Sequence, residues 1–176
     1  MKTIGAKEQR LIEEEAASGG TSAGVLMERA GRALAERILG LQAERAGGPV
    51  SILCGPGNNG GDGFAAARCL HGKVPDLRIY EEQPSSGVWG ADAQANRAAC
   101  LALGLKPYEL ADFLPTSGIL LDAVYGSGFR AERSPRPEFI TLSQKLAASR
   151  AQFGAYLLSA DIPSGVQADN GAVYEG

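Results

Sequence analysis

Residues 50–64 have the sequence VSILCGPGNNGGDGF. A five-residue, largely apolar run leads directly into a segment made almost wholly of Gly, Asn, Pro and Asp, and a helical pattern follows from Phe64 to Leu70. A strand, a glycine-rich turn and a helix in this order are typical of α/β folds that present backbone N–H groups to an anion. Because glycine has no side chain, so many glycines in one turn predict that something bulky lies close to this backbone.

Strand and helix patterns alternate along the rest of the chain. Strands are predicted at about 50–54, 77–81, 106–110, 118–124 and 155–161, and helices at about 7–17, 21–41, 62–71, 90–103 and 138–149. Strands that alternate with helices through short links predict a three-layer α/β/α, Rossmann-like fold with a mostly parallel sheet. A length of 176 residues with no internal repeat or linker suits one domain over residues 1–176.

Composition narrows the class of protein. The net charge of −3 gives no support for a nucleic-acid or membrane-surface partner. No segment reaches the ~20 apolar residues of a membrane span, and residues 1–8 have no apolar core of a signal peptide, so a cytoplasmic protein is expected. The three cysteines lack metal-ligand spacing and predict free, mostly buried thiols. The single histidine, His71, precedes Gly72 and is expected at a helix C-terminus.

The glycine-rich turn admits a second interpretation. Gly55-x-Gly57-x-x-Gly60 matches the dinucleotide fingerprint, and Glu81 and Glu82 follow the next predicted strand, where an acid that binds the ribose is expected. Pro56 removes a donor from the turn, and Asp62 is expected to cap the following helix, where its carboxylate would repel a pyrophosphate. An NAD(P)-dependent oxidoreductase therefore stays open as an alternative, beside a non-catalytic binding module of the same fold.

Two more loops with unusual polar residues follow predicted strands. Asp122 and Asp161 each close an apolar run, where a carboxylate is poorly solvated and needs a partner or a ligand. In a parallel sheet these loops and the glycine-rich turn meet at the carboxyl ends of the strands. Oxygen atoms of Asn, Asp and Ser gathered there suit a hard cation, whereas the sequence offers no Cys/His cluster for a transition metal.

Three segments in this order resemble the NAD(P)H-hydrate epimerases, the YjeF N-terminal-domain family. They are Gly55–Gly63, Asp122–Gly128 and Asp161–Gly165, and the earlier run Leu26–Gly31 is similar to the family's N-terminal helix. The resemblance covers nearly the whole chain. It implies an isomerase that interconverts the R and S epimers of hydrated NADH and NADPH, NADHX and NADPHX, whose reduced nicotinamide ring carries a hydroxyl group. It also implies a functional partner, an ATP- or ADP-dependent dehydratase that consumes only the S form and is often fused to the epimerase in bacteria.

The resemblance further implies which residues form the site. One potassium ion is expected, with Asn59, Asp122 and Ser164 as its ligands. Substrate contacts are expected from Asn58, Asn59, Gly60, Gly61 and Asp62, from Gly126, Ser127, Gly128, Phe129, Arg130, Ala131 and Glu132, and from Asp161. Inversion of a carbon that bears a hydroxyl beside a ring nitrogen requires its C–O or C–N bond to open and re-form. A carboxylate could move the hydroxyl proton, and Asp122 and Asp161 are the two candidates for this catalytic role.

The sequence supports three smaller expectations. Members of the family continue for several tens of residues beyond the Asp161–Gly165 motif, so this chain is expected to lack C-terminal strands. The small residues Ala30 and Gly31 make one helix face narrow enough for a strand or a partner to pack closely, which leaves a homodimer open. Trp89 is expected to be a packing anchor, with stacking on a substrate as the alternative.

Overall fold

The computed structural model describes residues 5–45, 47–129 and 137–173. Its centre is a parallel sheet with the strand order β3-β2-β1-β4-β5. The strands are β1 (Val50–Cys54), β2 (Leu77–Glu81), β3 (Tyr108–Glu109), β4 (Ile119–Ala123) and β5 (Tyr156–Ser159). The helices are α1 (Ala6–Ser18), α2 (Ala23–Glu44), α3 (Asn58–Leu70), α4 (Ala91–Ala102), the 3₁₀ helix η1 (Leu110–Asp112) and α5 (Pro137–Phe153).

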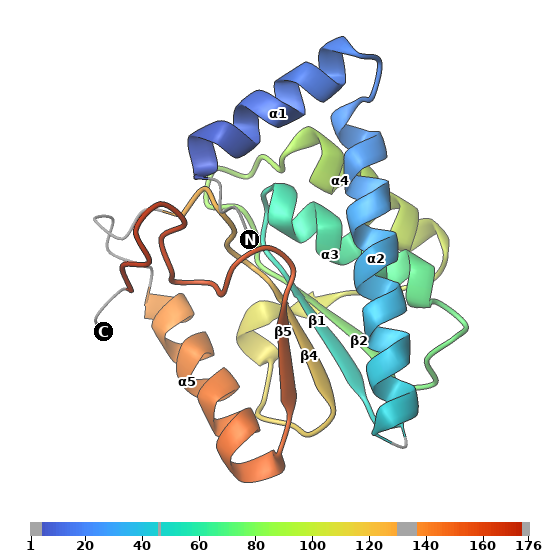
Figure 1. Cartoon of the computed structure of the whole chain (residues 1–176). Helices are drawn as coiled ribbons and strands as arrows, with labels where there is room; N and C mark the ends of the chain where they lie inside the picture. The colour runs from blue at the N-terminus through green and yellow to red at the C-terminus, as the bar shows by residue number, and fades with distance from the viewer. Residues whose placement is uncertain (1–4, 46, 130–136, 174–176) are drawn as a thin grey trace.

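The elements form three layers, as the sequence predicts (Figure 1). Helices α2, α3 and α4 cover one face of the sheet, and α5 and η1 cover the other. Helix α1 lies across the end of the sheet at which β1 and β4 terminate (Figure 1). The carboxyl ends of the strands therefore face a space that is bounded on one side by α1.

Strands β1 and β4 form the centre of the core. All five residues of each strand are buried, and their side chains alternate between the two faces. Ile52 and Leu121 belong to the cluster under α2 and α3, whereas Leu53 and Leu120 belong to the cluster under α5. Burial on both faces explains why the sequence of these strands shows no regular polar alternation.

Helix α3 begins at Asn58, and the prediction that it begins with Asp62 as its cap is wrong. Gly57 is the N-cap residue and supplies no side-chain hydrogen bond, so Asp62 lies in the second turn of the helix. A Cβ atom at Gly60 would lie only 1.7 Å from the carbonyl oxygen of Gly55. The glycines thus pack closely against the end of β1, and this packing stabilises the first turn of the helix. Gly and Asn have low intrinsic helix propensity, so tertiary contacts outweigh propensity here.

The narrow face of α2 is occupied by α3 of the same chain. A Cβ atom at Gly31 would lie 2.4 Å from the Cβ of Ala65, which shows how closely the two helix backbones approach. The structure therefore uses Gly31 for packing within the chain, whereas Ala30 lines a cleft. Trp89 packs against the core cluster, with its ring 5.9 Å from that of Phe64 and 5.2 Å from the guanidinium carbon of Arg97. These contacts fit the interpretation of Trp89 as a packing anchor.

Other boundaries differ modestly from the predicted ones. The strand predicted at 106–110 is reduced to Tyr108–Glu109, because the chain turns there into η1. Helix α5 extends to Phe153, four residues beyond the predicted end. The three cysteines are free, and Cys54 and Cys100 are buried, as the sequence predicts. In the described part of the chain, no helix combines the length and apolar character needed to cross a bilayer.

Candidate functional site

A cleft of about 1020 Å³ opens at the carboxyl ends of β1, β4 and β5. Three segments that are far apart in the sequence line it, namely the start of α3, the loop after β4 and the loop after β5. Of the predicted substrate contacts, Asn58, Asn59, Asp62, Gly126, Ser127, Gly128, Phe129 and Asp161 line the cleft. Gly60 and Gly61 are buried behind its wall, and Arg130, Ala131 and Glu132 lie outside the described residues.

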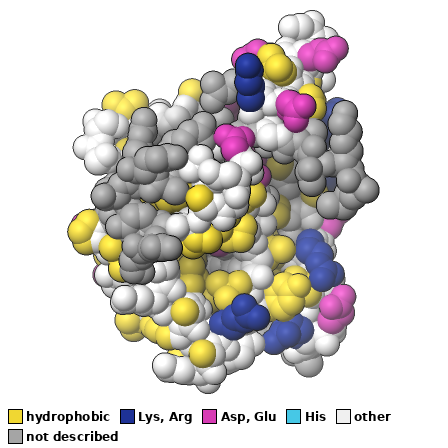
Figure 2. Space-filling model, turned by 60° about the vertical axis from the view of Figure 1, so that its left-hand side comes forward, with side chains coloured by type: hydrophobic (Ala, Val, Ile, Leu, Met, Phe, Trp, Pro, Cys, Tyr) yellow, Lys and Arg dark blue, Asp and Glu magenta, His cyan; other side chains and the backbone are white. Residues whose placement is uncertain are grey.

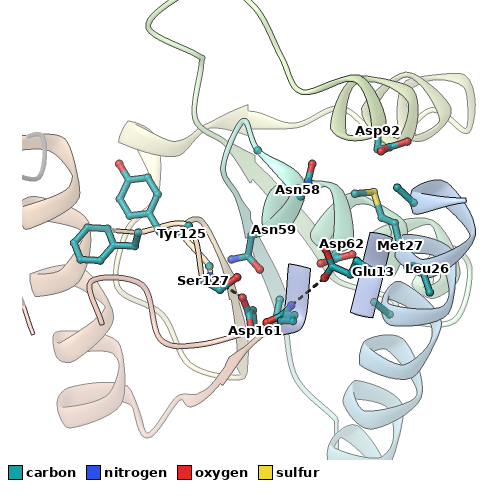
Figure 3. A pocket seen from close by; sticks show the side chains of 18 of the residues that line it. Glu13, Leu26, Met27, Asn58, Asn59, Asp62, Asp92, Tyr125, Ser127 and Asp161 are labelled. Atoms are coloured by element: carbon teal, nitrogen blue, oxygen red, sulfur yellow. Dashed lines mark hydrogen bonds between the residues drawn. The ribbon is translucent and has the colours of Figure 1, made fainter. Parts of the chain in front are cut away.

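Asn59 is the most unusual polar side chain of the cleft. It is 9% exposed, and neither its amide oxygen nor its amide nitrogen has a hydrogen-bond partner among the described residues. A buried amide without partners costs about 1–3 kcal/mol. Figure 3 shows this amide on the same side of the cleft as Ser127 and Asp161. The arrangement therefore leaves Asn59 available to a ligand or an ion.

Gly126 allows two polar side chains to come together beside it. A Cβ atom at this position would lie 2.9 Å from Asp161 Oδ2 and 3.2 Å from Asn59 Cγ. The backbone N–H of the next residue, Ser127, donates to Asp161 Oδ2 at 2.7 Å. One loop thus fixes the carboxylate of Asp161 next to the amide of Asn59.

Asp122 does not line the cleft and lies behind it. Its Oδ1 accepts from the Ser164 hydroxyl at 2.5 Å and from the Val124 N–H at 3.2 Å, and its Oδ2 accepts from the Ser164 N–H at 2.8 Å. The Ser164 hydroxyl also accepts from the Tyr125 N–H at 2.8 Å. Burial raises the pKa of Asp122, and the hydrogen bonds from Ser164 and Val124 oppose that shift. Asp122 and Ser164, two of the three predicted ion ligands, are therefore in direct contact.

Asp62 points into the cleft from the second turn of α3 (Figure 3). Its carboxyl group makes no hydrogen bond or ion pair with the other described residues. Burial raises its pKa from the ordinary 3.8 to about 7, and the negative charges of Asp161 and Glu13 add to the shift. A carboxylic acid that is still partly protonated near neutral pH is thus available inside the cleft.

Helix α1 contributes a wall that the sequence did not suggest. Lys7, Gln9, Glu13 and Ala17 line the cleft, and Gln9 Nε2 donates to Glu13 Oε1 at 3.1 Å. No motif in residues 6–18 distinguishes these residues from an ordinary charged helix, so only the tertiary placement of α1 reveals them. Asp and Glu side chains gather at the top of the molecule, the end at which α1 lies (Figure 2).

The cleft has an acidic lining on balance. Its described lining includes five carboxyl groups, Glu13, Asp62, Asp92, Asp161 and Asp169, and a single cationic side chain, Lys7. An apolar part is formed by Leu26, Met27, Ala30 and the stacked rings of Tyr125 and Phe129, whose centroids are 5.8 Å apart. An acidic surface beside aromatic rings favours a ligand group that is flat and positively charged.

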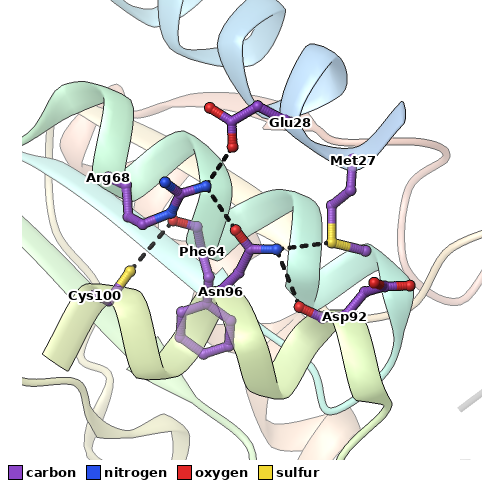
Figure 4. A network of polar contacts seen from close by, with 7 residues as sticks. All are labelled: Met27, Glu28, Phe64, Arg68, Asp92, Asn96 and Cys100. Atoms are coloured by element: carbon purple, nitrogen blue, oxygen red, sulfur yellow. Dashed lines mark hydrogen bonds and ion pairs between the residues drawn. The ribbon is translucent and has the colours of Figure 1, made fainter. Parts of the chain in front are cut away.

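A polar network behind the cleft joins α2, α3 and α4 (Figure 4). Arg68 donates to Glu28 and, at 2.7 Å, to Asn96 Oδ1. Asn96 Nδ2 in turn contacts the sulfur of Met27 at 3.1 Å and the backbone carbonyl of Asp92 at 3.0 Å. Met27 and Asp92 both line the cleft, so this network fixes the positions of two lining residues.

Glu81, one of the two residues considered for ribose recognition beside Glu82, has another role in the structure. Glu81 is buried, and its two carboxylate oxygens accept from Nε and Nη2 of Arg97, both at 2.6 Å. Its carboxylate is therefore engaged within the chain, on the α4 side of β2. This observation removes Glu81 as the acid that would bind the ribose of a dinucleotide at residues 55–60, and of the two candidates it leaves Glu82.

The available donor set consists of oxygen atoms, which suit a hard cation. In residues 5–45, 47–129 and 137–173, no three His, Cys, Asp or Glu side chains are grouped as a metal site. The candidate ligands are the amide oxygen of Asn59, the carboxylate of Asp122 and the hydroxyl of Ser164, all of which are oxygen donors. The unpartnered Asn59 amide is the observation that fits an ion, because an ion would satisfy its buried oxygen.

Several known proteins are similar in sequence. The chain is 34% identical over 166 residues to the bifunctional NAD(P)H-hydrate repair enzyme Nnr of Coxiella burnetii. The aligned region covers 93% of this chain but only about a third (32%) of that relative. It is also 33% identical to the NAD(P)H-hydrate epimerase of Rhodobacter capsulatus, where the alignment covers 92% of this chain and 76% of the relative. The identity to the NAD(P)H-hydrate epimerase of Elusimicrobium minutum is 33% as well, over 97% of this chain and 79% of the relative.

The fold is also that of a solved protein. The crystal structure of yeast ynu0 superposes with a TM-score of 0.80 over 98% of this chain and 75% of the yeast chain, at 21% sequence identity. Residues 23–176 match the family described as YjeF-related protein N-terminus. This stretch includes every segment of the cleft except the wall formed by α1. The chain is therefore a member of the YjeF-related N-terminal family.

Proposed function

We propose that this protein is an isomerase that interconverts the R and S epimers of hydrated NADH and NADPH. One observation carries the proposal: the start of α3, the loop after β4 and Asp161 line a single cleft. A volume of about 1020 Å³ has room for a dinucleotide-sized ligand. Relatives of similar length that are named NAD(P)H-hydrate epimerase support the same activity.

We also propose a potassium ion held by Asn59, Asp122 and Ser164. The unpartnered buried amide of Asn59 and the direct contact of Ser164 with Asp122 support this ligand set. When bound, the ion would supply a fixed positive charge at the end of β4. Asp122 then holds the ion and Ser164, while Asp161, which lines the cleft, remains the candidate that contacts the substrate.

A dehydratase specific for the S epimer is the proposed functional partner. Relatives named bifunctional repair enzymes are about three times as long as the matched region, which leaves room in them for a second activity. A cytoplasmic setting agrees with the free thiols of Cys54 and Cys100. In that setting the epimerase converts the R form into the form that the dehydratase consumes.

A coupled assay tests the activity. An R/S mixture of NADPHX is incubated in potassium buffer with an S-specific dehydratase, and the consumption of the R form is followed with and without the chain. We expect acceleration in potassium and a smaller one when sodium replaces it. The dehydratase alone gives the spontaneous rate, and equal rates with and without the chain would contradict the proposal.

A homodimer is proposed on separate grounds. Leu11 and Ile12 on α1 are 55% and 53% exposed, and exposed large apolar side chains are typical of interfaces. We expect sedimentation equilibrium to give twice the mass of 18.2 kDa. Leu11→Ser with Ile12→Ser is expected to give monomers, whereas Val88→Ser, at a 73% exposed loop residue, leaves the mass unchanged. A monomeric wild-type chain at all concentrations would exclude the dimer.

A further inference from the structure

Three elements bring carboxyl groups to one part of the cleft. Asp62 comes from α3, Glu13 from α1 and Asp161 from the loop after β5 (Figure 3). Asp161 is fixed by the N–H of Ser127, and Glu13 accepts from Gln9. Among these three, Asp62 alone makes no hydrogen bond to the described residues, so its carboxyl group is available to a ligand.

Asp62 also differs in its protonation. It is half-buried, and this burial together with the charges of Asp161 and Glu13 raises its pKa to about 7. The other charged groups of the described lining are Asp92 on α4, Asp169 near the end of the chain and Lys7 on α1. A proton donor for catalysis works best when its pKa lies near the working pH, which Asp62 satisfies.

We propose that Asp62 is the acid–base residue that carries the proton during epimerisation, with the carboxylate of Asp161 stabilising the positive charge that forms on the substrate ring. This inference rests on the proposed function and goes beyond the two candidates, Asp122 and Asp161, that the sequence suggested. Asp122 lies outside the cleft lining with both oxygens bonded to Ser164, so it cannot reach a substrate hydroxyl as directly as Asp62 can.

The proton balance of the reaction is complete with this one acid. Protonated Asp62 gives its proton to the substrate hydroxyl, the C–O bond breaks, and water leaves. The lone pair of the adjacent ring nitrogen forms a C=N bond, so the ring becomes a cation and Asp62 a carboxylate. Water then adds to the opposite face of the same carbon and loses a proton, which returns to Asp62 through solvent, and the neutral ring is restored with inverted configuration.

The charge of the cleft favours this route over opening of the C–N bond. Five carboxyl groups and one lysine line the described part of the cleft, and a cationic ring is stabilised by such a field. Opening of the C–N bond yields a neutral aldehyde, which gains little from these charges. The acidic lining therefore favours the route in which positive charge develops on the ring.

Steady-state kinetics on the coupled assay test the inference. We expect Asp62→Asn to lower kcat at least about 100-fold while KM changes less than about threefold, because removal of a positioned proton donor costs this much in rate. Asp112→Asn serves as the control, since Asp112 is an exposed carboxylate of η1 outside the cleft. Circular dichroism of each variant establishes that the fold is retained.

The pH profile provides a second measurement that does not depend on the folding of a variant. The kcat/KM of the wild-type chain is expected to fall as the pH rises through about 7, since the protonated form of Asp62 starts the reaction. A rate that rises over pH 6–9, or an Asp62→Asn variant within threefold of the wild type, would overturn the assignment. An inert wild-type chain would instead contradict the proposed function, so the two failures are distinguishable.

Discussion

Asp122 and Ser164 hold each other through two hydrogen bonds across 42 positions of sequence, one to each carboxylate oxygen. The contact ties the end of β4 to the loop that follows β5, and it brings Asp161, three residues before Ser164, into a fixed position. Because Asp122 is buried, water does not compete for these hydrogen bonds. Each is stronger than a hydrogen bond at the surface, since its acceptor is a carboxylate in a region of low dielectric constant.

Loss of this contact is expected to destabilise the protein. Asp122→Asn should lower the free energy of unfolding by about 2–3 kcal/mol and Ser164→Ala by about 1–2 kcal/mol, since each leaves buried polar groups without partners. The double variant should cost at least about 1 kcal/mol less than the sum, because both changes remove the same interaction. Urea denaturation in potassium-free buffer measures all three. Strictly additive losses would show that the two residues stabilise the fold independently.

Asp62 should make the stability of the protein depend on pH. Its pKa is about 7 in the folded protein against an ordinary 3.8, so the folded state holds this proton more tightly than the unfolded state. The bound proton therefore contributes its full share to the free energy of unfolding below about pH 4, and this contribution is lost as the pH rises through about 7.

The variant Asp62→Asn should remove that dependence. Relative to the wild type, it is expected to gain about 2 kcal/mol of stability between pH 4 and pH 8, a value reduced for the partial solvent exposure of the site. Chemical denaturation at the two pH values gives the comparison, with Asp112→Asn as an exposed control. A wild-type protein that becomes more stable over this range relative to Asp62→Asn would contradict the assigned pKa shift.

Two glycines of α2 should respond in opposite directions to alanine. A Cβ at Gly31 would collide with Ala65 at 2.4 Å, whereas a Cβ at Gly40 meets nothing within 4 Å. Gly31→Ala is expected to cost about 1–3 kcal/mol through overpacking. Gly40→Ala is expected to add about 0.5–1 kcal/mol through higher helix propensity. Thermal unfolding of both variants decides the matter, and equal effects would exclude close packing as the cause.

Potassium should stabilise the folded chain through Asn59. At a potassium concentration of about ten times the dissociation constant, binding would raise the free energy of unfolding by about 1.4 kcal/mol. Asn59→Ala should remove that gain. In sodium, the same change should cost little, because the wild-type amide is already buried without a partner. Thermal melts in potassium and sodium chloride measure both effects. A potassium effect that survives in Asn59→Ala would assign the ion to other ligands.

Most of the architecture could be predicted from local sequence. Strands β1 and β4 were predicted almost to the residue, because five consecutive buried positions produce an unmistakable apolar run. The start of α3 was misplaced by four residues. Glycine and asparagine have poor helix propensity, and the contacts that stabilise this turn, such as Gly60 against Gly55, involve the end of the preceding strand and cannot be inferred from local composition.

The site was predicted in part. Loop motifs pointed to Asn59, Asp122 and Asp161, but nothing in them distinguished the carboxylate that faces the cleft from the one bonded behind it. That distinction depends on the side of β4 to which Asp122 turns and on its contact with Ser164. The roles of Lys7 and Glu13 depend on how α1 crosses the sheet, which sequence periodicity does not specify.

The glycines at the start of α3 carry a consequence for how this protein tolerates change. Their close neighbours are other parts of the same chain, Gly55 for Gly60, Met27 for Gly61 and Cys54 for Gly63. The start of α3, which forms one wall of the cleft, is therefore held in place by the packing of the folded chain. Side chains introduced at these positions should reduce the yield of soluble protein, and the molecules that do fold should carry a displaced wall and bind ligand more weakly. A mutational survey that measures only the rate per folded molecule would consequently underestimate how strongly packing constrains these glycines.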